Sequence, residues 1–439
     1  MKKGISFLSA TVSLLLTLLL LASCAFDSAL GIKGAEINGN GELILSYTDG
    51  SAQNLGVVVG SDGKDGSNGS NGSLNINKTE NGIASASAKG LRSAVSIESK
   101  FQAVVQLGGW RPGYGSTTTK DYSSEGSGVI YKLDKGEGDA FIITNYHVVY
   151  DSSSNTENGI SHDISVYLYG SELEEKAIKA SYVGGSLYYD IAVLRIEDSE
   201  ILKASDACAI TAANSDEISV GDRAIAIGNA KGYRISTSSG IVSVDSEYIT
   251  MTAADDKTRV SFRVMRVDTA VNSGNSGGGL FDEQGNLIGI VNAKIVDDGV
   301  ESIGYAIPSN VALSVADNVI DHCFDTDGER VKRAYHGITV SASDSRAVYN
   351  SELGSISIVE TVSVYEVSAD SLAEGVLKSG DVIVDMSIND VKYDITRQYQ
   401  VVDLMLDARV GDVVKFNILR EGKSESVSFT VTEDRIIEY

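Results

Sequence analysis

Cysteine is scarce in this chain of 439 residues, which has only Cys24, Cys208 and Cys323. Cys24 closes an apolar run at the N-terminus, and two further cysteines far apart in the sequence do not make a disulfide framework. The chain also lacks the HExxH spacing of zinc proteases, and His322 beside Cys323 is an adjacent pair without ligand spacing. We therefore expect a fold that depends on its hydrophobic core and uses no metal and no other cofactor.

Positive charge is also in short supply. The chain has 36 Lys and Arg residues against 60 Asp and Glu residues, which gives a net charge of −24. No basic patch and no interleaving of basic and aromatic residues occurs, so a nucleic-acid partner is excluded. The apolar content of 42% and charged content of 22% are normal for a globular chain, and the length allows two or three domains.

One long apolar run is present, and it follows Lys2, Lys3 and Gly4. The run ISFLSATVSLLLTLLLLAS, closed by Cys24, predicts a secretory signal over residues 1–24. The tetrapeptide LASC resembles a bacterial lipobox, which predicts lipidation of Cys24. An uncleaved membrane-spanning anchor is the alternative, because the run is nearly long enough to span. Both interpretations place the rest of the chain outside the cytosol, tethered to a bacterial membrane on the cell surface or the periplasmic side.

Residues 25–59 alternate short strands with Asn-Gly and Asp-Gly turns, which predicts a small β module. Glycine then recurs at every third position from Gly60 to Gly72. These triplets contain no proline, so a collagen-like helix is disfavoured. Residues 60–92 are rich in Gly, Ser and Asn, and we expect them to form a flexible spacer.

The remaining chain divides into two further segments. Residues 93–330 contain many short apolar strands separated by turn residues, which is the pattern of an all-β sandwich or barrel. Pro308 opens a predicted helix near the end of this segment. Residues 331–439 mix short strands with two predicted helices, around Ser371–Leu377 and Gln400–Ala408.

The stretch VNSGNSGGGLFD packs four glycines between Gly274 and Gly279, around Ser276. Apolar residues flank it, and the following FDEQGNLIGIVNAKI predicts a hairpin, so the turn is fixed between strands. A serine hydroxyl in such a turn is a candidate nucleophile for acyl transfer. The backbone amides of Gly274, Asn275 and Ser276 are candidate donors to the oxyanion that forms during this reaction.

An activated serine needs a base, and the chain has only four histidines. His147 differs from the other three because it follows the apolar strand FIIT, which would hold an imidazole rigidly. Asp190 opens the near-continuous apolar run DIAVLRI, where an unpaired carboxylate would be costly. His147 would supply its partner, and the chain order of His147, Asp190 and Ser276 is that of a chymotrypsin-type triad.

Seven segments in the right order resemble the signature of the HtrA (Deg) family of serine proteases: TNYHVV, DIAVLRI, GDRAIAIGNAKG, SSGIVSV, VDTAVNSGNSGGGL, LIGIVNAKI and SIGYAIPSN. The resemblance implies a mainly β fold with a chymotrypsin-like double β-barrel over residues 93–330. It also implies that His147 is the base, Asp190 its orienter and Ser276 the nucleophile. Val271, Ile290 and Lys294 fall where the family lines the pocket for small aliphatic residues before the cut, although Val271 equally fits a plain core position.

The C-terminal segment 331–439 resembles a PDZ domain of the HtrA type, on the stretch SADSLAEGVLKSGDVIVDMSINDV and the helix QVVDLMLDA. YHGITV takes the position of its carboxylate-binding loop, whose amides hold a peptide C-terminus while the peptide adds a strand to the sheet. This implies a peptide site at Tyr335, His336, Gly337 and Ile338. A purely structural role for the domain is the alternative.

Together these features predict a membrane-tethered, extracytoplasmic serine endopeptidase that cleaves unfolded or misfolded proteins and binds peptide C-termini through its PDZ domain. The family resemblance also implies a homotrimer or a higher multiple. Two alternatives are a non-proteolytic chaperone or surface-binding protein on the same scaffold, and an esterase that uses the same acyl chemistry.

Overall fold

The computed structural model describes residues 31–40, 42–57, 82–107, 116–171, 174–294, 303–323, 331–351 and 354–438. The predicted signal segment, Cys24 and the glycine triplets lie outside these ranges, so they stay predictions. None of the helices within the described ranges is long and apolar enough to cross a membrane. The chain separates into two compact units, Met1–Ile76 and Asn77–Tyr439.

The first unit contains a three-stranded antiparallel sheet in the order β1-β2-β3, which agrees with the predicted β module. Its strands are β1 (Ile32–Ile37), β2 (Glu42–Tyr47) and β3 (Ala52–Val57). Asn38 and Asp49 accept hydrogen bonds from backbone amides in the two turns, which fixes the hairpins. Leu45 on the central strand is buried.

The first described element of the second unit is a helix that the sequence did not predict. The expected spacer, residues 60–92, is wrong at its C-terminal end, because α2 spans Ile83–Leu91. Ala86 and Gly90 are the buried residues of this helix. Gly90 lies so close to Ile227 and Phe281 that no larger side chain fits without movement. The small residues of α2, whose composition resembles that of a linker, therefore let the helix pack closely on the second barrel.

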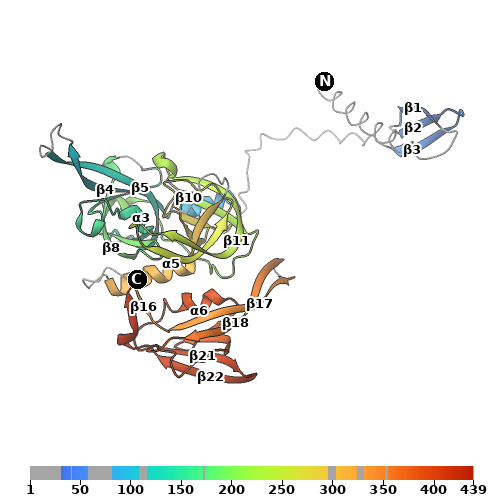
Figure 1. The fold of residues 1–439 in the computed structure, drawn as a ribbon. Helices are drawn as coiled ribbons and strands as arrows, with labels where there is room; N and C mark the ends of the chain where they lie inside the picture. The colour runs from blue at the N-terminus through green and yellow to red at the C-terminus, as the bar shows by residue number, and fades with distance from the viewer. Residues whose placement is uncertain are drawn as a thin grey trace. The chain divides into compact units, whose positions relative to one another are not determined.

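The first barrel is closed in the strand order β4-β5-β6-β9-β8-β7 (Figure 1). Its strands are β4 (Ala94–Leu107), β5 (Ser116–Asp134), β6 (Asp139–Thr144), β7 (Asp163–Leu168), β8 (Ile178–Ser186) and β9 (Ile191–Ile196). Short helices in its connections are α3 (Tyr146–Val149), η2 (Glu157–Gly159), η3 (Glu174–Lys176) and α4 (Glu200–Ala204). Alternate strand residues such as Ile97, Ile142 and Leu194 fill the interior.

The second barrel is closed in the order β10-β11-β12-β15-β14-β13. Its strands are β10 (Arg223–Gly228), β11 (Ser236–Thr252), β12 (Arg259–Val267), β13 (Gly279–Phe281), β14 (Leu287–Val291) and β15 (Gly304–Pro308), with the short turn η4 (Ala230–Gly232) after β10. The predicted hairpin joins β13 to β14 through Gly285, whose φ of 73° suits glycine. Helix α5 (Ser309–Cys323) begins directly after Pro308, as the sequence predicts. Two barrels in tandem confirm the predicted mainly β, chymotrypsin-like architecture.

The C-terminal domain is built on a six-stranded sheet, drawn in orange and red in Figure 1. Its main path is β17 (Ile338–Asn350), β18 (Ser355–Val367), β19 (Val382–Ile388), β21 (Val413–Arg420) and β22 (Lys423–Thr430), and β20 (Val391–Asp394) pairs with β19. A small second sheet joins β16 (Lys332–Ala334) to β23 (Ile436–Glu438), which follows the short turn η5 (Glu433–Arg435). Helix α6 (Gln398–Leu404) corresponds to the helix predicted at 400–408. The helix predicted at Ser371–Leu377 is wrong: these residues form consecutive turns, interrupted by Gly375 at a φ of 74°.

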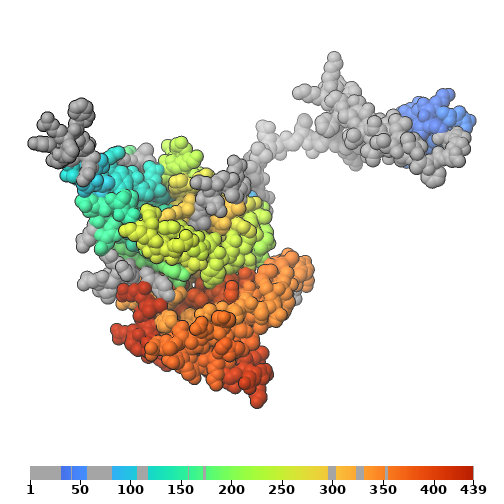
Figure 2. Space-filling model, in the orientation of Figure 1, coloured from blue at the N-terminus to red at the C-terminus, as the bar shows by residue number. Residues whose placement is uncertain are grey.

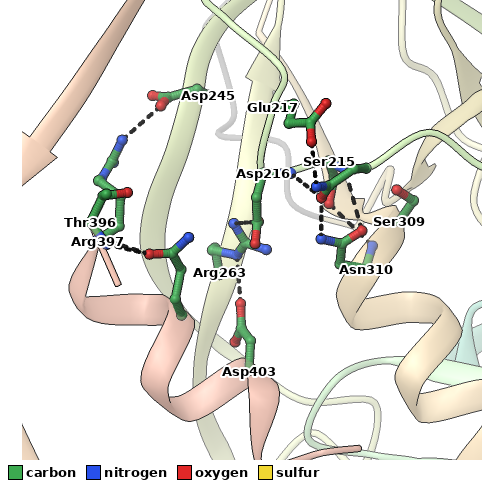
Figure 3. Close-up of polar contacts among 12 residues, drawn as sticks. Ser215, Asp216, Glu217, Asp245, Arg263, Ser309, Asn310, Thr396, Arg397 and Asp403 are labelled. Carbon is green, nitrogen blue, oxygen red and sulfur yellow. Dashed lines mark hydrogen bonds and ion pairs between the residues drawn. The ribbon is translucent and has the colours of Figure 1, made fainter. Parts of the chain in front are cut away.

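Helix α6 contacts strand β12 of the second barrel, and the space-filling view shows the C-terminal residues against that barrel (Figure 2). Arg263 of β12 lies between Asp216 and Asp403 of α6, with an ion-pair distance of 2.9 Å to each (Figure 3). The Tyr399 ring covers the guanidinium at 3.9 Å, and the Arg263 side chain is only 1% exposed. Burial raises the pKa of Asp403 to about 6, although Arg263 opposes this shift. The contact is therefore a desolvated charge cluster that depends on its full set of partners.

Candidate active site

His147 lies at the start of α3, immediately after β6. Its ring Nδ1 is 2.7 Å from Oδ2 of Asp190, and its backbone N–H donates to Oδ1 at 3.0 Å. Two contacts to one carboxylate fix both the ring and the backbone that carries it. The His147 side chain remains 18% exposed and that of Asp190 only 6%, so Nε2 is the ring atom left for a reacting group.

Asp190 precedes β9 with a φ of 54°, in the left-handed region that Asp tolerates better than most residues. Its carbonyl accepts hydrogen bonds from the backbone of Tyr146 and the side chain of Asn145. Its Oδ2 also accepts a hydrogen bond from Nδ2 of Asn292, at 2.8 Å. The strained backbone is thus held by partners on both barrels, and the buried carboxylate has the donors that its charge requires.

Ser276 lies in the glycine turn before β13 and is 5% exposed. Its Oγ accepts a hydrogen bond from the backbone N–H of Ala293 at 3.3 Å, and its carbonyl accepts one from Ser127. Among the described residues, no hydrogen bond joins Ser276 Oγ to His147. In serine hydrolases without substrate the contact between nucleophile and base is often loose and tightens when the substrate binds.

Gly274 has a φ of 94°, a conformation that a side chain would strain, and a Cβ there would collide with the carbonyl of Asn229. The carbonyl of Ser273 accepts a hydrogen bond from Lys231 N–H at 2.7 Å. Since a trans peptide points its C=O and N–H in opposite directions, the Gly274 amide faces away from Lys231. The Gly274 carbonyl is held in turn by Ser127 Oγ at 2.7 Å. The four-glycine turn therefore orients backbone amides.

The three predicted oxyanion donors are not equivalent. The Asn275 amide donates to the Asn272 carbonyl at 2.9 Å and closes a tight turn, so its prediction as an oxyanion donor is wrong. The amides of Gly274 and Ser276 have no acceptor within the described part of the chain. These two N–H groups, in a site enclosed by buried side chains, are suited to stabilise a developing negative charge.

Two functional residues escaped the sequence analysis. Asn292 bonds the triad carboxylate, and Ser127 bridges the barrels: its Oγ donates to Gly274 and accepts from the N–H of Asn229 at 2.7 Å. Thr144 supports Ser127 by donating to its carbonyl. The available signals were the position of Ser127 between two glycines and the polar Asn292 at the end of an otherwise apolar strand.

The residues predicted to line the substrate pocket lie in different surroundings. Val271 is partly buried against the core of the second barrel. Ile290 is fully buried on β14, opposite Gly279 and Ile307, and has no exposed surface. Lys294 is exposed, and its Nζ donates to the Ala253 carbonyl at 3.0 Å. The pocket stays a prediction, with Val271 and Lys294 as its accessible members.

The residues of the predicted carboxylate-binding loop lie together: three connect β16 to β17, and Ile338 is the first residue of β17. The amide of Tyr335 donates to Arg435, that of His336 to Ala334, and that of Ile338 to Nδ1 of His336. Burial, assisted by the nearby Arg333, lowers the pKa of His336 to about 3, so the ring is a neutral acceptor. Gly337 has a φ of 72°. Three of the four amides thus already have partners inside the domain.

The chain is similar to known serine proteases. A family model described as a trypsin-like peptidase domain matches residues 126–290. The chain is 32% identical to the serine protease Do-like HtrA of Lactococcus lactis subsp. cremoris, over 82% of this chain and 84% of that protein. It is 30% identical to the periplasmic serine endoprotease DegP of Escherichia coli, over 76% of this chain and 62% of DegP. A solved structure of the HtrA-type protease AlgW with a decapeptide is 25% identical, with a TM-score of 0.48, and covers 80% of this chain and 98% of AlgW.

Proposed function

The chain belongs to the HtrA family of serine proteases and is a serine endopeptidase, and from that premise we propose that it cleaves unfolded or misfolded proteins outside the cytosol through a covalent acyl-enzyme. The observation that carries the mechanism is the 2.7 Å contact between His147 Nδ1 and Asp190 Oδ2. This contact leaves Nε2 of His147 as the base for Ser276.

The reaction begins when Ser276 Oγ attacks the carbonyl carbon of the scissile bond and gives its proton to Nε2 of His147. Asp190 stabilises the imidazolium that results, and Asn292 keeps the carboxylate oriented. The carbonyl oxygen becomes negative and accepts hydrogen bonds from the amides of Gly274 and Ser276. When the C–N bond breaks, His147 returns the proton to the leaving amine.

Water completes the cycle. His147 takes a proton from a water molecule while the water oxygen attacks the acyl carbon, again with the oxyanion held by the Gly274 and Ser276 amides. The ester bond to Ser276 then breaks, and the proton passes from His147 back to Oγ. The products are a new carboxyl terminus, a new amino terminus and the unchanged enzyme.

The C-terminal domain would act as the peptide-binding PDZ module. Strand β17 ends the main sheet, where β18 is its one neighbour among the described strands, and α6 packs close to it. An extended peptide can therefore add as a further strand beside β17, with its C-terminus at Tyr335, His336, Gly337 and Ile338. Because three amides of this loop already have internal partners, peptide binding requires the loop to exchange them, beginning with the bond between Ile338 and the His336 ring. Anisotropy of a labelled peptide with an apolar C-terminus, compared with its C-terminal amide, tests this: equal binding of the two would contradict it.

We also propose that a lipid on Cys24 anchors the enzyme outside the cytosol and that it assembles as a homotrimer or a higher multiple. Mass spectrometry of the N-terminal peptide from cell membranes tests the anchor, since an acylated Cys24 and an unmodified apolar segment differ in mass. Sedimentation of the full-length chain tests the assembly.

The central experiment compares the full-length chain with its Ser276→Ala variant on a reduced, unfolded protein. Loss of the nucleophile should lower turnover by about 10⁶-fold, while the melting temperature stays near that of the parent. A folded variant that degrades the substrate as fast as the parent would refute the mechanism. A parent that binds unfolded protein but never cleaves it would instead favour a chaperone.

A further inference from the structure

The turn after β10 lies directly against the nucleophile turn. Lys231 N–H donates to the carbonyl of Ser273, and Gly274 comes within contact distance of the backbone of Asn229 and Lys231. On its other side, Gly232 packs against the Glu125 carboxylate of β5. Residues 229–234 therefore lie against the turn that carries the catalytic serine and are supported by both barrels.

The segment that follows β14 contacts the serine as well. Ala293 donates to Ser276 Oγ there, and the proposed pocket for residues before the cut includes Lys294 on the same segment. A peptide that enters along this segment and passes Ser276 toward the turn at 229–234 would bring the residues after the cut, which leave with the amine that His147 protonates, against this turn.

Tyr233 is the most conspicuous side chain of that turn. It is 81% exposed, the highest value among the large apolar side chains of the described residues. A single exposed aromatic residue is unremarkable on most surfaces. On a turn that contacts the nucleophile loop, however, a tyrosine offers a broad apolar face with only two side-chain torsions to order. The left-handed backbone of Lys231, with a φ of 55°, and the bond from its N–H to Ser273 fix the turn in advance.

We propose that Tyr233 determines specificity on the leaving side of the scissile bond, by packing against a large apolar or aromatic side chain at the first or second residue after the cut. This inference rests on the proposed protease function and names a substrate preference of the same site. Large apolar side chains are the groups that unfolded proteins expose and folded proteins bury. Tyr233 would thereby favour cuts inside former core segments.

The test maps every new N-terminus that the full-length enzyme generates from one reduced, unfolded protein, using mass spectrometry. The parent should place large apolar residues at the first two positions after the cut roughly tenfold more often than Tyr233→Ala does, because one well-packed apolar contact has about this value in discrimination. Tyr233→Phe should keep the parent pattern, since the ring face is unchanged. Tyr365→Ala is the matched control: this tyrosine of β18 is 66% exposed and lies outside the protease barrels.

Kinetics on two peptides separate specificity from folding. The peptides share one mapped cleavage site and differ only in having Phe or Gly after the cut. We expect Tyr233→Ala to raise KM for the Phe peptide roughly tenfold and to leave the Gly peptide unchanged. Equal losses on both peptides, or identical maps for the parent and Tyr233→Ala, would overturn the inference while leaving the protease function intact. No cleavage by the parent would refute the proposed function itself.

Discussion

The hydroxyl of Ser127 should matter to catalysis although it touches no substrate. It donates to the carbonyl of Gly274 and accepts from the N–H of Asn229, each at 2.7 Å, and Ser127 has no exposed surface. Ser127→Ala leaves a buried C=O and a buried N–H without this partner. Each unsatisfied group costs about 1–3 kcal/mol, so the free energy of unfolding should fall by roughly 3 kcal/mol.

The same substitution should also loosen the oxyanion turn, because Ser127 holds the carbonyl of the residue that supplies one oxyanion donor. Complete loss of one such donor lowers kcat by about 10²–10³-fold. Since the Lys231 bond to Ser273 remains, we expect a smaller effect, roughly 10–100-fold in kcat with little change in KM.

Urea unfolding measures the change in the free energy of unfolding, and it is followed in a Ser276→Ala background to prevent self-cleavage. Initial rates on an unfolded substrate measure kcat. The matched control is Ser99→Ala. Ser99 also has no exposed surface, and its Oγ has no hydrogen-bond partner within the described residues, so its removal should change stability by less than about 1 kcal/mol and leave kcat alone. If Ser127→Ala and Ser99→Ala behave alike, the bridge from the first barrel does not hold the oxyanion turn.

Three further predictions concern charge. Asp190→Asn should lower kcat by about 10⁴-fold with KM nearly unchanged, because the amide no longer selects the His147 tautomer. Single-turnover rates measure this loss, and a loss below tenfold would argue against the pairing of His147 with Asp190. Arg263→Ala should lower the free energy of unfolding, measured by urea titration, by about 3–5 kcal/mol, because Asp403 is left buried without its cation. The double variant Arg263→Met with Asp403→Leu should recover most of this lost stability. Burial holds the pKa of His336 at about 3 in the folded state, below its ordinary 6.5, so the unfolded chain binds the extra proton and stability falls as the pH drops below 6.5. Between pH 7.5 and 5.0 the parent should lose about 2 kcal/mol of its free energy of unfolding that the His336→Gln variant keeps. The raised pKa of Asp403 has the opposite effect on stability, but Asp403 is present in both proteins. Equal acid sensitivity of the two proteins would therefore refute the assignment.

The sequence predicted those site residues whose burial would be unfavourable without a partner. Asp190 at the head of an apolar strand needed a partner, and His147 after another apolar strand was available, so their pairing followed from burial alone. Short apolar strands separated by turns predicted an all-β sandwich or barrel, and the resemblance to the HtrA family implied that there are two barrels. Helix α2 was missed because its Ala, Ser and Gly residues resemble a linker, and only the close approach of Gly90 to Ile227 explains their small size. At Ser371–Leu377 the helical pattern was overruled by one glycine in the left-handed region.

The orientation of the amides in the glycine turn could not be predicted at all. The residues from Gly274 to Ser276 offer three N–H groups, and composition does not rank them. Their directions are decided by partners far away in the chain: Lys231 fixes the Ser273 peptide, and Ser127 fixes the Gly274 carbonyl. Asn275, whose N–H turns back to Asn272, is thereby excluded from the oxyanion site. Because Ser127 belongs to the first barrel and Lys231 to the second, the oxyanion geometry exists only when both barrels are folded and in contact. Catalytic competence in this chain is therefore a property of the barrel interface, and substitutions there should lower activity before they lower the content of β-structure.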